Sequence, residues 1–379
     1  MKRLKITEPW FDEDERTAVM DVLASGQLVQ AGRVAEFEQR FAAEARVQHA
    51  VMVSSGTAAL HLTMLALGIG PGDAVAIPDF TFVATANAVA LTGATPLFVD
   101  VRPDTYNMDV SSLRRLVEPM KDRKNGGGLR LKAIMPVHQF GLPAEMNLLA
   151  EIAKEHSLYL IEDAACALGS RYQDRAVGTW GLAACFSFHP RKVITTGEGG
   201  AVVTNDRQLA DRIRALRAHG FAPQDGSSVL IAKGLNYRMT EIQAALGLSQ
   251  LRKLPEILQR RRTLAESLHQ HLEGIDWFAR PSVPLRVSPN WQSYAGVLGP
   301  GVNRTQVIEG LAARGVEART PATAIHLLGA YQSSSQPSSH DCPVAEMLDA
   351  RALALPLHPL MDEADVKRVA TELRGINPA

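Results

Sequence analysis

A lysine and an aspartate, each close to the end of an apolar run, are the residues of this sequence best suited to chemistry. Asp163 ends the run LYLIED, and Lys192 follows the run AACFSF within the stretch FSFHPRKVITTGEGG. A lysine amine can form a Schiff base with the aldehyde of pyridoxal phosphate, and a carboxylate can keep the pyridine nitrogen of that cofactor protonated. The pair therefore predicts an enzyme that moves amino groups.

Each residue of this pair also has a plainer explanation. Asp163 could cap a helix over the AACAL residues that follow it, and Glu162 beside it competes for the same role. Adjacent residues of a strand point to opposite faces, so only one of the two carboxylates can face the cofactor. A lone lysine after a strand is usually solvated, but Ser187, His189 and the TTGEGG turn around Lys192 argue against that interpretation.

Two further segments have the chemistry to hold the rest of such a cofactor. Ser54, Ser55, Gly56 and Thr57 lie between an apolar run and an Ala- and Leu-rich helix, and the free N–H groups at a helix N-terminus attract phosphate. An ordinary helix cap with a glycine turn is the alternative. Phe82, just after the next apolar run, can stack on an aromatic ring. A core phenylalanine at a helix start is the alternative there.

The composition excludes several other classes of protein. The chain has 379 residues, 46% of them hydrophobic, and its 40 Lys and Arg balance 40 Asp and Glu, so no net charge attracts nucleic acid or anionic membrane. The basic N-terminus has no apolar segment behind it, and no apolar run approaches the ~20 residues of a membrane helix. The cysteines are too few and scattered for a metal site or a disulfide framework: Cys166, Cys185 and Cys342. We expect a cytoplasmic protein.

Apolar runs that alternate with helical segments predict a large α/β domain. After a helical region over about 12–46, seven runs read as strands buried on both faces, which is typical of a mostly parallel sheet. Those runs are 49–54, 73–78, 95–101, 131–137, 158–163, 183–188 and 200–205.

The pattern changes after the last of these runs. A long helical segment over 239–273 leads into a C-terminal part with mixed elements, so we expect a large domain over 1–254 and a smaller α+β domain over 255–379. The C-terminal part has a predicted strand at 293–299 and predicted helices near 303–314, 343–352 and 363–374. Polar, breaker-rich segments at 121–128 and 331–343 predict surface loops.

Four ordered motifs carry a resemblance to a known family. They are SSGTAALHL, EDAACALGS, FSFHPRKVITTGEGGAVVTND and GLNYRMTEIQAALGLSQL. Together they resemble sugar aminotransferases of the DegT/StrS type, a branch of the fold type I pyridoxal phosphate enzymes. The resemblance extends from VLASGQLVQAGRVAEFEQRFA to LALPLHPLMDEADVKRV, almost the whole chain. It implies the fold type I architecture, with a seven-stranded, mostly parallel sheet in the large domain.

The resemblance also implies a role for each matching residue. Lys192 would form the Schiff base, Asp163 would pair with the pyridine nitrogen, and Phe82 would lie over the cofactor ring. The family's phosphate ligands match Gly56, Thr57 and Ser187. Asn236, in GLNYRM, matches an asparagine that reaches the phosphate from the neighbouring subunit, which implies a homodimer with shared active sites.

Two positions near the expected sugar site and cofactor match the family's pattern less closely. His326 resembles a histidine near the sugar site of the family. Cys166 stands where many members have Gln or His as a hydrogen-bond partner of the cofactor's 3-oxygen, and a thiol is only a weak donor. Glu198, in the GEGG turn, receives no role.

The reaction that the resemblance implies is transamination. Glutamate would convert pyridoxal phosphate to pyridoxamine phosphate, which would then aminate the keto group of a nucleotide-linked sugar. A keto-cyclitol is an alternative acceptor, because the motifs bind cofactor and do not separate acceptors. Dehydratases of the family lose the lysine, so Lys192 argues against that activity. A noncatalytic regulatory protein would have eroded Asp163, Lys192 or the phosphate turn, and all three are present.

Overall fold

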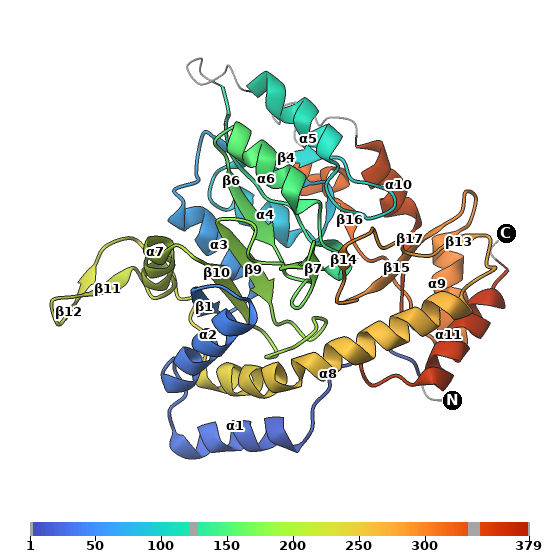
Figure 1. Ribbon diagram of the computed structural model, residues 1–379, viewed down its shortest axis with the longest axis horizontal. Helices are drawn as coiled ribbons and strands as arrows, with labels where there is room; N and C mark the ends of the chain where they lie inside the picture. The colour runs from blue at the N-terminus through green and yellow to red at the C-terminus, as the bar shows by residue number, and fades with distance from the viewer. Residues whose placement is uncertain (1–2, 121–127, 333–341, 378–379) are drawn as a thin grey trace.

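The computed structural model describes residues 3–120, 128–332 and 342–377 (Figure 1). The two predicted surface loops, 121–128 and 331–343, lie almost entirely outside the described residues. None of the described helices combines the length and the apolar character needed to cross a membrane.

A central sheet is formed by seven strands of the described residues, one for each predicted run, and its order is β1-β10-β9-β6-β5-β2-β4. β10 pairs antiparallel with both of its neighbours, and the other neighbouring pairs are parallel. The mostly parallel sheet expected for fold type I is therefore confirmed. The strands are β1 His49–Val53, β2 Asp73–Pro78, β4 Thr95–Val99, β5 Arg130–Ile134, β6 Tyr159–Asp163, β9 Ala183–Ser187 and β10 Gly200–Thr204.

Helices cover both faces of this sheet, which explains its unbroken apolar strands. In β9, Ala183 and Cys185 join the core on one face, while Ala184 and Phe186 join the core on the other. The first face is covered by α3 Gly56–Ala66, α4 Ala84–Ala90 and α7 Arg207–Arg217. The second face is covered by α2 Gly32–Glu44, α5 Val110–Val117 and α6 Met146–Glu155.

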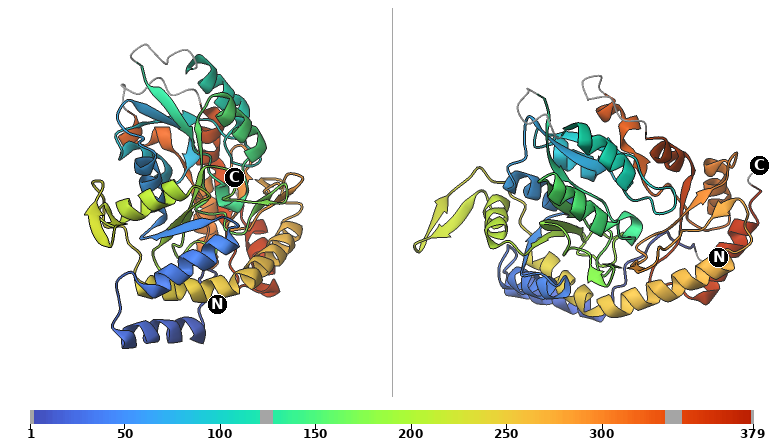
Figure 2. Two further views of the ribbon diagram at one scale, coloured as in Figure 1. Left: turned by 60° about the vertical axis from the view of Figure 1, so that its left-hand side comes forward. Right: turned by 45° about the horizontal axis from the view of Figure 1, so that its top comes forward.

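One long helix, α8 Glu241–His271, connects the two halves of the molecule (Figure 2). It begins at a capping box between Thr240 and Gln243. Its first half contributes to the core beside α2, and its second half contributes to the core of the C-terminal part. α1, Glu13–Ser25, packs along it. The expected domain boundary between residues 254 and 255 falls inside this continuous helix.

The C-terminal part is built on the antiparallel sheet β13-β15-β17, with a short extension that returns to the large sheet. In that extension, β16 Thr323–Ala324 pairs with β3 Phe80–Thr81, just beyond β2. The other elements here are β13 Phe278–Ala279, β15 Tyr294–Leu298, β17 Ala352–Leu355, α9 Arg304–Ala313, η4 Ile325–Leu327, η5 Gly329–Tyr331, α10 Pro343–Arg351 and α11 Glu363–Arg374. Shorter elements elsewhere are β7 Arg171–Tyr172, β8 Arg175–Ala176, β14 Val287–Ser288, η1 Glu118–Met120 and η3 Gln139–Gly141.

A two-stranded arm projects from the body of the molecule beside α7 (Figures 1 and 2). It consists of β11 Phe221–Gln224 and β12 Ser227–Leu230, paired antiparallel. Asp225 and Gly226 connect them and both have positive φ, as a type I′ hairpin turn requires. Phe221, Leu230 and the following Ile231 are exposed.

Candidate active site

The ends of the parallel strands bring the predicted chemistry to one edge of the sheet. β10 alone runs against the others, so the carboxyl ends of β1, β2, β6 and β9 meet at the same edge. Such an edge is the usual ligand site of an open α/β sheet. The predicted residues Gly56, Asp163 and Ser187 lie at or just after these strand ends.

Asp163 is a buried carboxylate on the α3/α4 side of the sheet, with only 4% of its surface exposed. The Thr85 hydroxyl donates to its Oδ2 at 2.8 Å, and the N–H of Ala165 donates to its Oδ1 at 3.2 Å. Burial raises the pKa of Asp163, and these two hydrogen bonds oppose that effect. The residues after it form turns and no helix, so the helix-capping alternative is not realised.

Glu162 faces the opposite side of the sheet, where both of its carboxylate oxygens accept hydrogen bonds. His138 Nε2 lies 3.0 Å from its Oε2. Nδ1 of that histidine accepts the N–H of Ala144, so the ring proton is on Nε2 and donates to the carboxylate. Burial opposes ionisation of Glu162, but the hydrogen bonds from His138 and from backbone N–H groups lower its pKa. Those N–H groups belong to Gly178, Trp180 and Gly181.

Lys192 lies in the loop after β9 and is half-buried. Its backbone N–H donates to the carbonyl of His189 at 2.8 Å, which anchors the loop. Its Nζ is 3.1 Å from Sγ of Cys166, which follows Asp163 in the next segment. No carboxylate of the described residues forms an ion pair with this amine, so Lys192 is free to react at the edge where Asp163 is buried.

The N-terminus of α3 lies against the end of β9. Ser55 caps the helix by accepting the N–H of Ala58 at 3.1 Å, and Gly56 and Thr57 are its first two residues. A Cβ on Gly56 would be 2.7 Å from Cβ of Ser187, so only glycine allows this approach. The contact places the Ser187 hydroxyl beside the first turn of α3, where backbone N–H groups have no acceptor within the helix, an arrangement that suits a phosphate.

Phe82 is an exposed aromatic ring beside the site. Phe82 is 61% exposed, so it is not a core phenylalanine, whereas the neighbouring Phe80 is fully buried. The N–H of Thr85 donates to the Phe82 carbonyl at 3.1 Å, which puts Phe82 one helical turn before the residue that contacts Asp163. Its face is therefore available for ring stacking.

These features fit pyridoxal phosphate. A buried carboxylate suits the pyridine nitrogen, the α3 N-terminus suits the phosphate, and the Lys192 amine suits the aldehyde. When bound, the cofactor supplies an electron sink for the carbon that carries the amine.

His326 is held by a buried carboxylate that the sequence did not single out. Asp79 follows β2 and is completely buried; its Oδ2 is 2.5 Å from Nδ1 of His326, and its Oδ1 accepts the backbone N–H of His326 at 3.0 Å. Burial raises the pKa of Asp79, and His326 opposes that effect. Nε2 of His326 is 3.4 Å from the exposed Glu346. The structure thus places His326 beside the segment that carries Phe82.

Asn236 lies elsewhere, in the segment between the arm and α8, and its side chain is exposed. Its backbone pairs with Ala218. Within the described part of the chain, no hydrogen bond connects its side chain to Lys192, Asp163 or Ser187.

Sequence reasoning missed Thr85 and Asp79. Asp79 had a usable signal, because it follows an apolar strand at the same sheet edge as Asp163. Thr85 had none, since a threonine near the start of a helix is ordinary.

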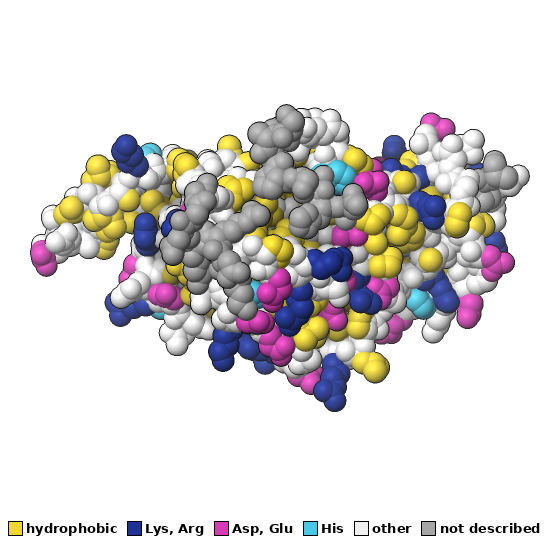
Figure 3. All heavy atoms as spheres, turned by 90° about the horizontal axis from the view of Figure 1, so that it is seen from above, with side chains coloured by type: hydrophobic (Ala, Val, Ile, Leu, Met, Phe, Trp, Pro, Cys, Tyr) yellow, Lys and Arg dark blue, Asp and Glu magenta, His cyan; other side chains and the backbone are white. Residues whose placement is uncertain are grey.

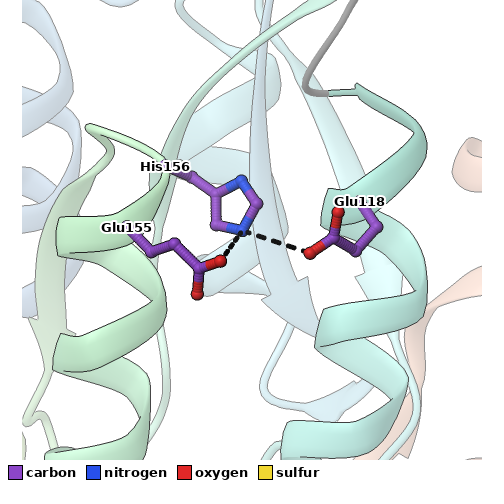
Figure 4. A group of neighbouring side chains, drawn as sticks. All are labelled: Glu118, Glu155 and His156. Carbon is purple, nitrogen blue, oxygen red and sulfur yellow. Dashed lines mark ion pairs between the residues drawn. The ribbon is translucent and has the colours of Figure 1, made fainter.

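A second group of titratable side chains lies at the opposite edge of the sheet (Figure 4). His156 precedes β6, and its Nε2 is 3.9 Å from a carboxylate oxygen of both Glu118 and Glu155. Both carboxylates are exposed, and Glu155 also pairs with Arg114 at 3.5 Å. We assign this group to surface ion pairing.

Comparison with known proteins identifies the family. The DegT/DnrJ/EryC1/StrS aminotransferase family matches residues 9–374. The chain belongs to this family. It is 39% identical to GDP-perosamine synthase of Caulobacter vibrioides over 377 residues, which cover 98% of each chain. The expected fold, enzyme class and transfer of amino groups are thereby confirmed.

Two solved structures add detail. The structure of DesI in the presence of its TDP-sugar product has a TM-score of 0.88 and 35% identity, covering 99% of this chain and 93% of DesI. The sugar aminotransferase Spr1654 of Streptococcus pneumoniae in its PLP form has a TM-score of 0.90 and 25% identity, covering 98% of each chain. The expected dependence on pyridoxal phosphate is confirmed with the family.

Proposed function

We propose that this aminotransferase transfers the amino group of glutamate to the keto group of a nucleotide-linked sugar, with pyridoxal phosphate as its cofactor and pyridoxamine phosphate as the nitrogen carrier. One observation carries the proposal: the amine of Lys192, which contacts Cys166 and forms no ion pair among the described residues, shares one edge of the sheet with the buried carboxylate of Asp163 and the N-terminus of α3.

Each of these residues has a defined task. Asp163 keeps a proton on the pyridine nitrogen, and Thr85 fixes the orientation of that carboxylate. Lys192 holds the cofactor between turnovers and moves a proton at the carbon that gains or loses the amine. Gly56 and Thr57 offer N–H groups to the phosphate, and the Ser187 hydroxyl adds a further donor.

The GDP-linked ketone whose amination gives GDP-perosamine is the first acceptor to test. The relative with 39% identity is named for that product, and DesI binds a TDP-sugar product. A dehydratase is disfavoured because Lys192 is present. A keto-cyclitol acceptor has no specific support from the residues around the site.

His326 is the residue that we propose for the sugar. Asp79 holds its Nδ1 and its backbone N–H together, so the ring has a fixed orientation with Nε2 directed outward toward Glu346. A fixed imidazole of this kind can bind a sugar hydroxyl.

A homodimer with shared active sites is proposed from the exposed apolar surface. Leu230 at the end of the arm and Ile231 just after it are 60% and 55% exposed, and apolar side chains gather on the arm at the left of Figure 3. Exposed apolar surface of this extent is typical of an interface. Asn236 lies six residues after Leu230, the last residue of the arm, so an arm that docks on a second copy can carry Asn236 to the α3 N-terminus of that copy.

The acceptor half-reaction tests the proposed function. Enzyme loaded with pyridoxamine phosphate is mixed with GDP-, TDP- and UDP-linked keto-sugars and with a keto-cyclitol, and the absorbance of the lysine-bound cofactor is followed. We expect this band to return with a keto-sugar nucleotide. Return of the band with the cyclitol alone would replace the proposed acceptor class.

A further inference from the structure

A thiol and an amine are in direct contact at the edge of the sheet that carries the candidate active site. Nζ of Lys192 lies 3.1 Å from Sγ of Cys166. Both residues are half-buried, so a small solute can reach them from solvent. Atoms about 3–3.5 Å apart are within the distance from which a bond can form directly. The pair therefore has the geometry of a modification site, at a position where many members of the family have glutamine or histidine.

One segment of the C-terminal part holds the backbone on both sides of this contact. Asn290 donates its side-chain N–H to the carbonyl of Cys166 at 2.8 Å. Gln292 donates its side-chain N–H to the carbonyl of Arg191, the residue before Lys192, at 2.7 Å. Asn290 and Gln292 are both buried, and the backbone N–H of Gln292 donates to Asn290 Oδ1 at 2.8 Å. The backbone positions from which the thiol and the amine extend are therefore fixed relative to one another.

The lysine amine is the nucleophile that lies within reach of this sulfur. In the described part of the chain, none of the cysteines belongs to a disulfide. Cys185 and Cys342 are buried in the hydrophobic core, and the Cys185 sulfur contacts the Thr63 hydroxyl at 3.3 Å. The Cys166 sulfur has its hydrogen bond with Lys192. An oxidised Cys166 therefore meets an amine and not a second thiol.

We propose that hydrogen peroxide joins Cys166 to Lys192 through a reversible sulfur–nitrogen bond, which withdraws the lysine from the reaction. Peroxide oxidises the thiol by two electrons to a sulfenic acid and is itself reduced to water. The amine, after it has lost its extra proton to solvent, then attacks the sulfur. The S–N bond forms and the S–O bond breaks, and the hydroxyl group leaves as a second water with a proton from the nitrogen.

The bond can be reversed by thiols, as other products of a sulfenic acid can. Two equivalents of thiol break the S–N bond, return the Cys166 thiol and the Lys192 amine, and are themselves oxidised to a disulfide. Neither glutamine nor histidine can undergo this oxidation. The inference thus gives a function to the cysteine at which this chain departs from the family's pattern, and it goes beyond the proposed function.

The form of the cofactor decides when the pair can react, and this step rests on the role proposed for Lys192. In the pyridoxal phosphate form the lysine nitrogen is occupied by the cofactor, so it cannot attack the sulfur. In the pyridoxamine phosphate form the amine is free. The bond therefore forms in enzyme that holds an amino group and waits for an acceptor.

Peptide mass spectrometry tests for the bond directly. The pyridoxamine phosphate form is treated with hydrogen peroxide, which is then removed with catalase, and the protein is digested with trypsin without reductant. Cys166 lies in the tryptic peptide 155–171, and a modified Lys192 lies in the peptide 192–207. We expect these peptides to be joined, with a mass two hydrogen atoms below their sum, and to separate on treatment with dithiothreitol. The pyridoxal phosphate form should give at least about tenfold less of the joined pair, because its lysine is occupied.

One result of this experiment would overturn the inference. It is the recovery of Cys166 as a sulfinic or sulfonic acid from the pyridoxamine phosphate form, with Lys192 unmodified.

Dimedone, which traps sulfenic acids, separates the two chemical steps. Without the amine the sulfenic acid persists, so dimedone should label Cys166 in Lys192→Gln at least about fivefold more than in wild type, both as pyridoxamine phosphate forms under peroxide. Lys154→Gln, at an exposed position of α6, is the matched control and should be labelled as wild type is. Equal labelling of wild type and Lys192→Gln would show that the amine does not react with the sulfur.

The rate of amination shows whether the bond acts as a switch. Peroxide should slow amination of a keto-sugar nucleotide by the pyridoxamine phosphate form at least about tenfold, and dithiothreitol should reverse the loss. Cys166→Gln should keep the rate of its own untreated sample, whereas Cys185→Ser should lose activity as wild type does. Equal inactivation of wild type and Cys166→Gln would count against the switch.

The two proposals fail in different ways. If no keto-sugar is aminated and the joined peptides are found, the acceptor is wrong and the bond stands. If keto-sugars are aminated and peroxide yields no joined peptides, only the bond is wrong.

Discussion

Lys192 Nζ lies 3.1 Å from Cys166 Sγ, so the proposed Schiff-base lysine contacts the position at which this chain departs from many members of its family. Cys166 follows Asp163 in the same turn segment, whose shape is fixed by Asn290. That side chain donates to the carbonyls of Cys166 and Leu168 at 2.8 and 2.9 Å. The pyridine partner and the lysine contact are therefore positioned together.

Cys166 should be the most reactive thiol of the cofactor-free protein. It is half-buried, whereas Cys185 and Cys342 are buried, and burial raises the pKa of the Cys185 thiol. Iodoacetamide labelling followed by peptide mass spectrometry should find Cys166 modified first, and pyridoxal phosphate should slow that labelling. Labelling that is unaffected by the cofactor would place the cofactor away from Cys166.

Lys192→Ala should reduce transamination by at least about a thousandfold, because it removes both the covalent anchor and the proton carrier. The melting temperature should stay near that of wild type, and the absorbance band of the lysine-bound cofactor should be lost. Lys154→Ala, at an exposed position of α6, should leave rate and spectrum unchanged. Substantial turnover by Lys192→Ala would refute the assignment of this lysine.

Asp163→Asn should stabilise the cofactor-free protein while it disables the enzyme. Burial raises the pKa of Asp163 in the folded state above the ordinary 3.8, so the folded protein holds a proton that the unfolded chain releases more easily. Stability therefore falls as pH rises from about 4 through the folded-state pKa, because ionising the buried carboxylate costs free energy. The neutral variant should melt at a higher temperature at pH 7, and the difference should shrink toward pH 4.

The exposed Asp21→Asn is the control for this experiment, and its effect on melting should be small at every pH. If cofactor-free Asp163→Asn melted below wild type at pH 7, the carboxylate would be stabilising and its pKa would be shifted in the other direction.

Gly56→Ala should weaken cofactor binding at least about tenfold and destabilise the protein by about 1–3 kcal/mol, the usual cost of forcing a methyl group into a packed position. Its new Cβ would be 2.7 Å from Cβ of Ser187, so α3 or β9 must shift. Gly32→Ala is a matched control, because Gly32 also begins a helix and a Cβ there would meet no atom within 4 Å. Fluorescence titration measures cofactor binding, and thermal unfolding measures stability. Equal behaviour of the two variants would contradict a phosphate site at the N-terminus of α3.

Two inactive variants should recover activity when they are mixed, if the active sites are shared between subunits. Asn236→Ala and Lys192→Ala are mixed under conditions that exchange subunits. A mixed dimer then has one site with an intact Lys192 and an intact partner Asn236, so activity should recover to about a quarter of wild type from random pairing of equal amounts. Proven exchange without recovered activity would show that Asn236 serves its own subunit.

The sequence predicted the strands well because each is buried on both faces, and such runs are unbroken in Val, Ile and Ala. It also separated Asp163 from Glu162 through the alternation of side chains along β6, and the structure puts these carboxylates on opposite faces with different partners. The local pattern of residue types was therefore sufficient to predict the strands and to separate the two carboxylates.

Contacts between distant segments could not be predicted in this way. Asp79 and His326 meet because β16 returns to pair with β3, and nothing near either residue signals that pairing.

The continuity of α8 has a consequence for how the chain tolerates cutting. A chain broken at residue 255 would leave each fragment with part of one helix and with an uncovered apolar stripe, since Leu248 packs into one core and Leu268 into the other. Neither fragment would be a self-sufficient folding unit. Because α8 belongs to both cores, we expect the two halves that build the active site to fold and unfold together.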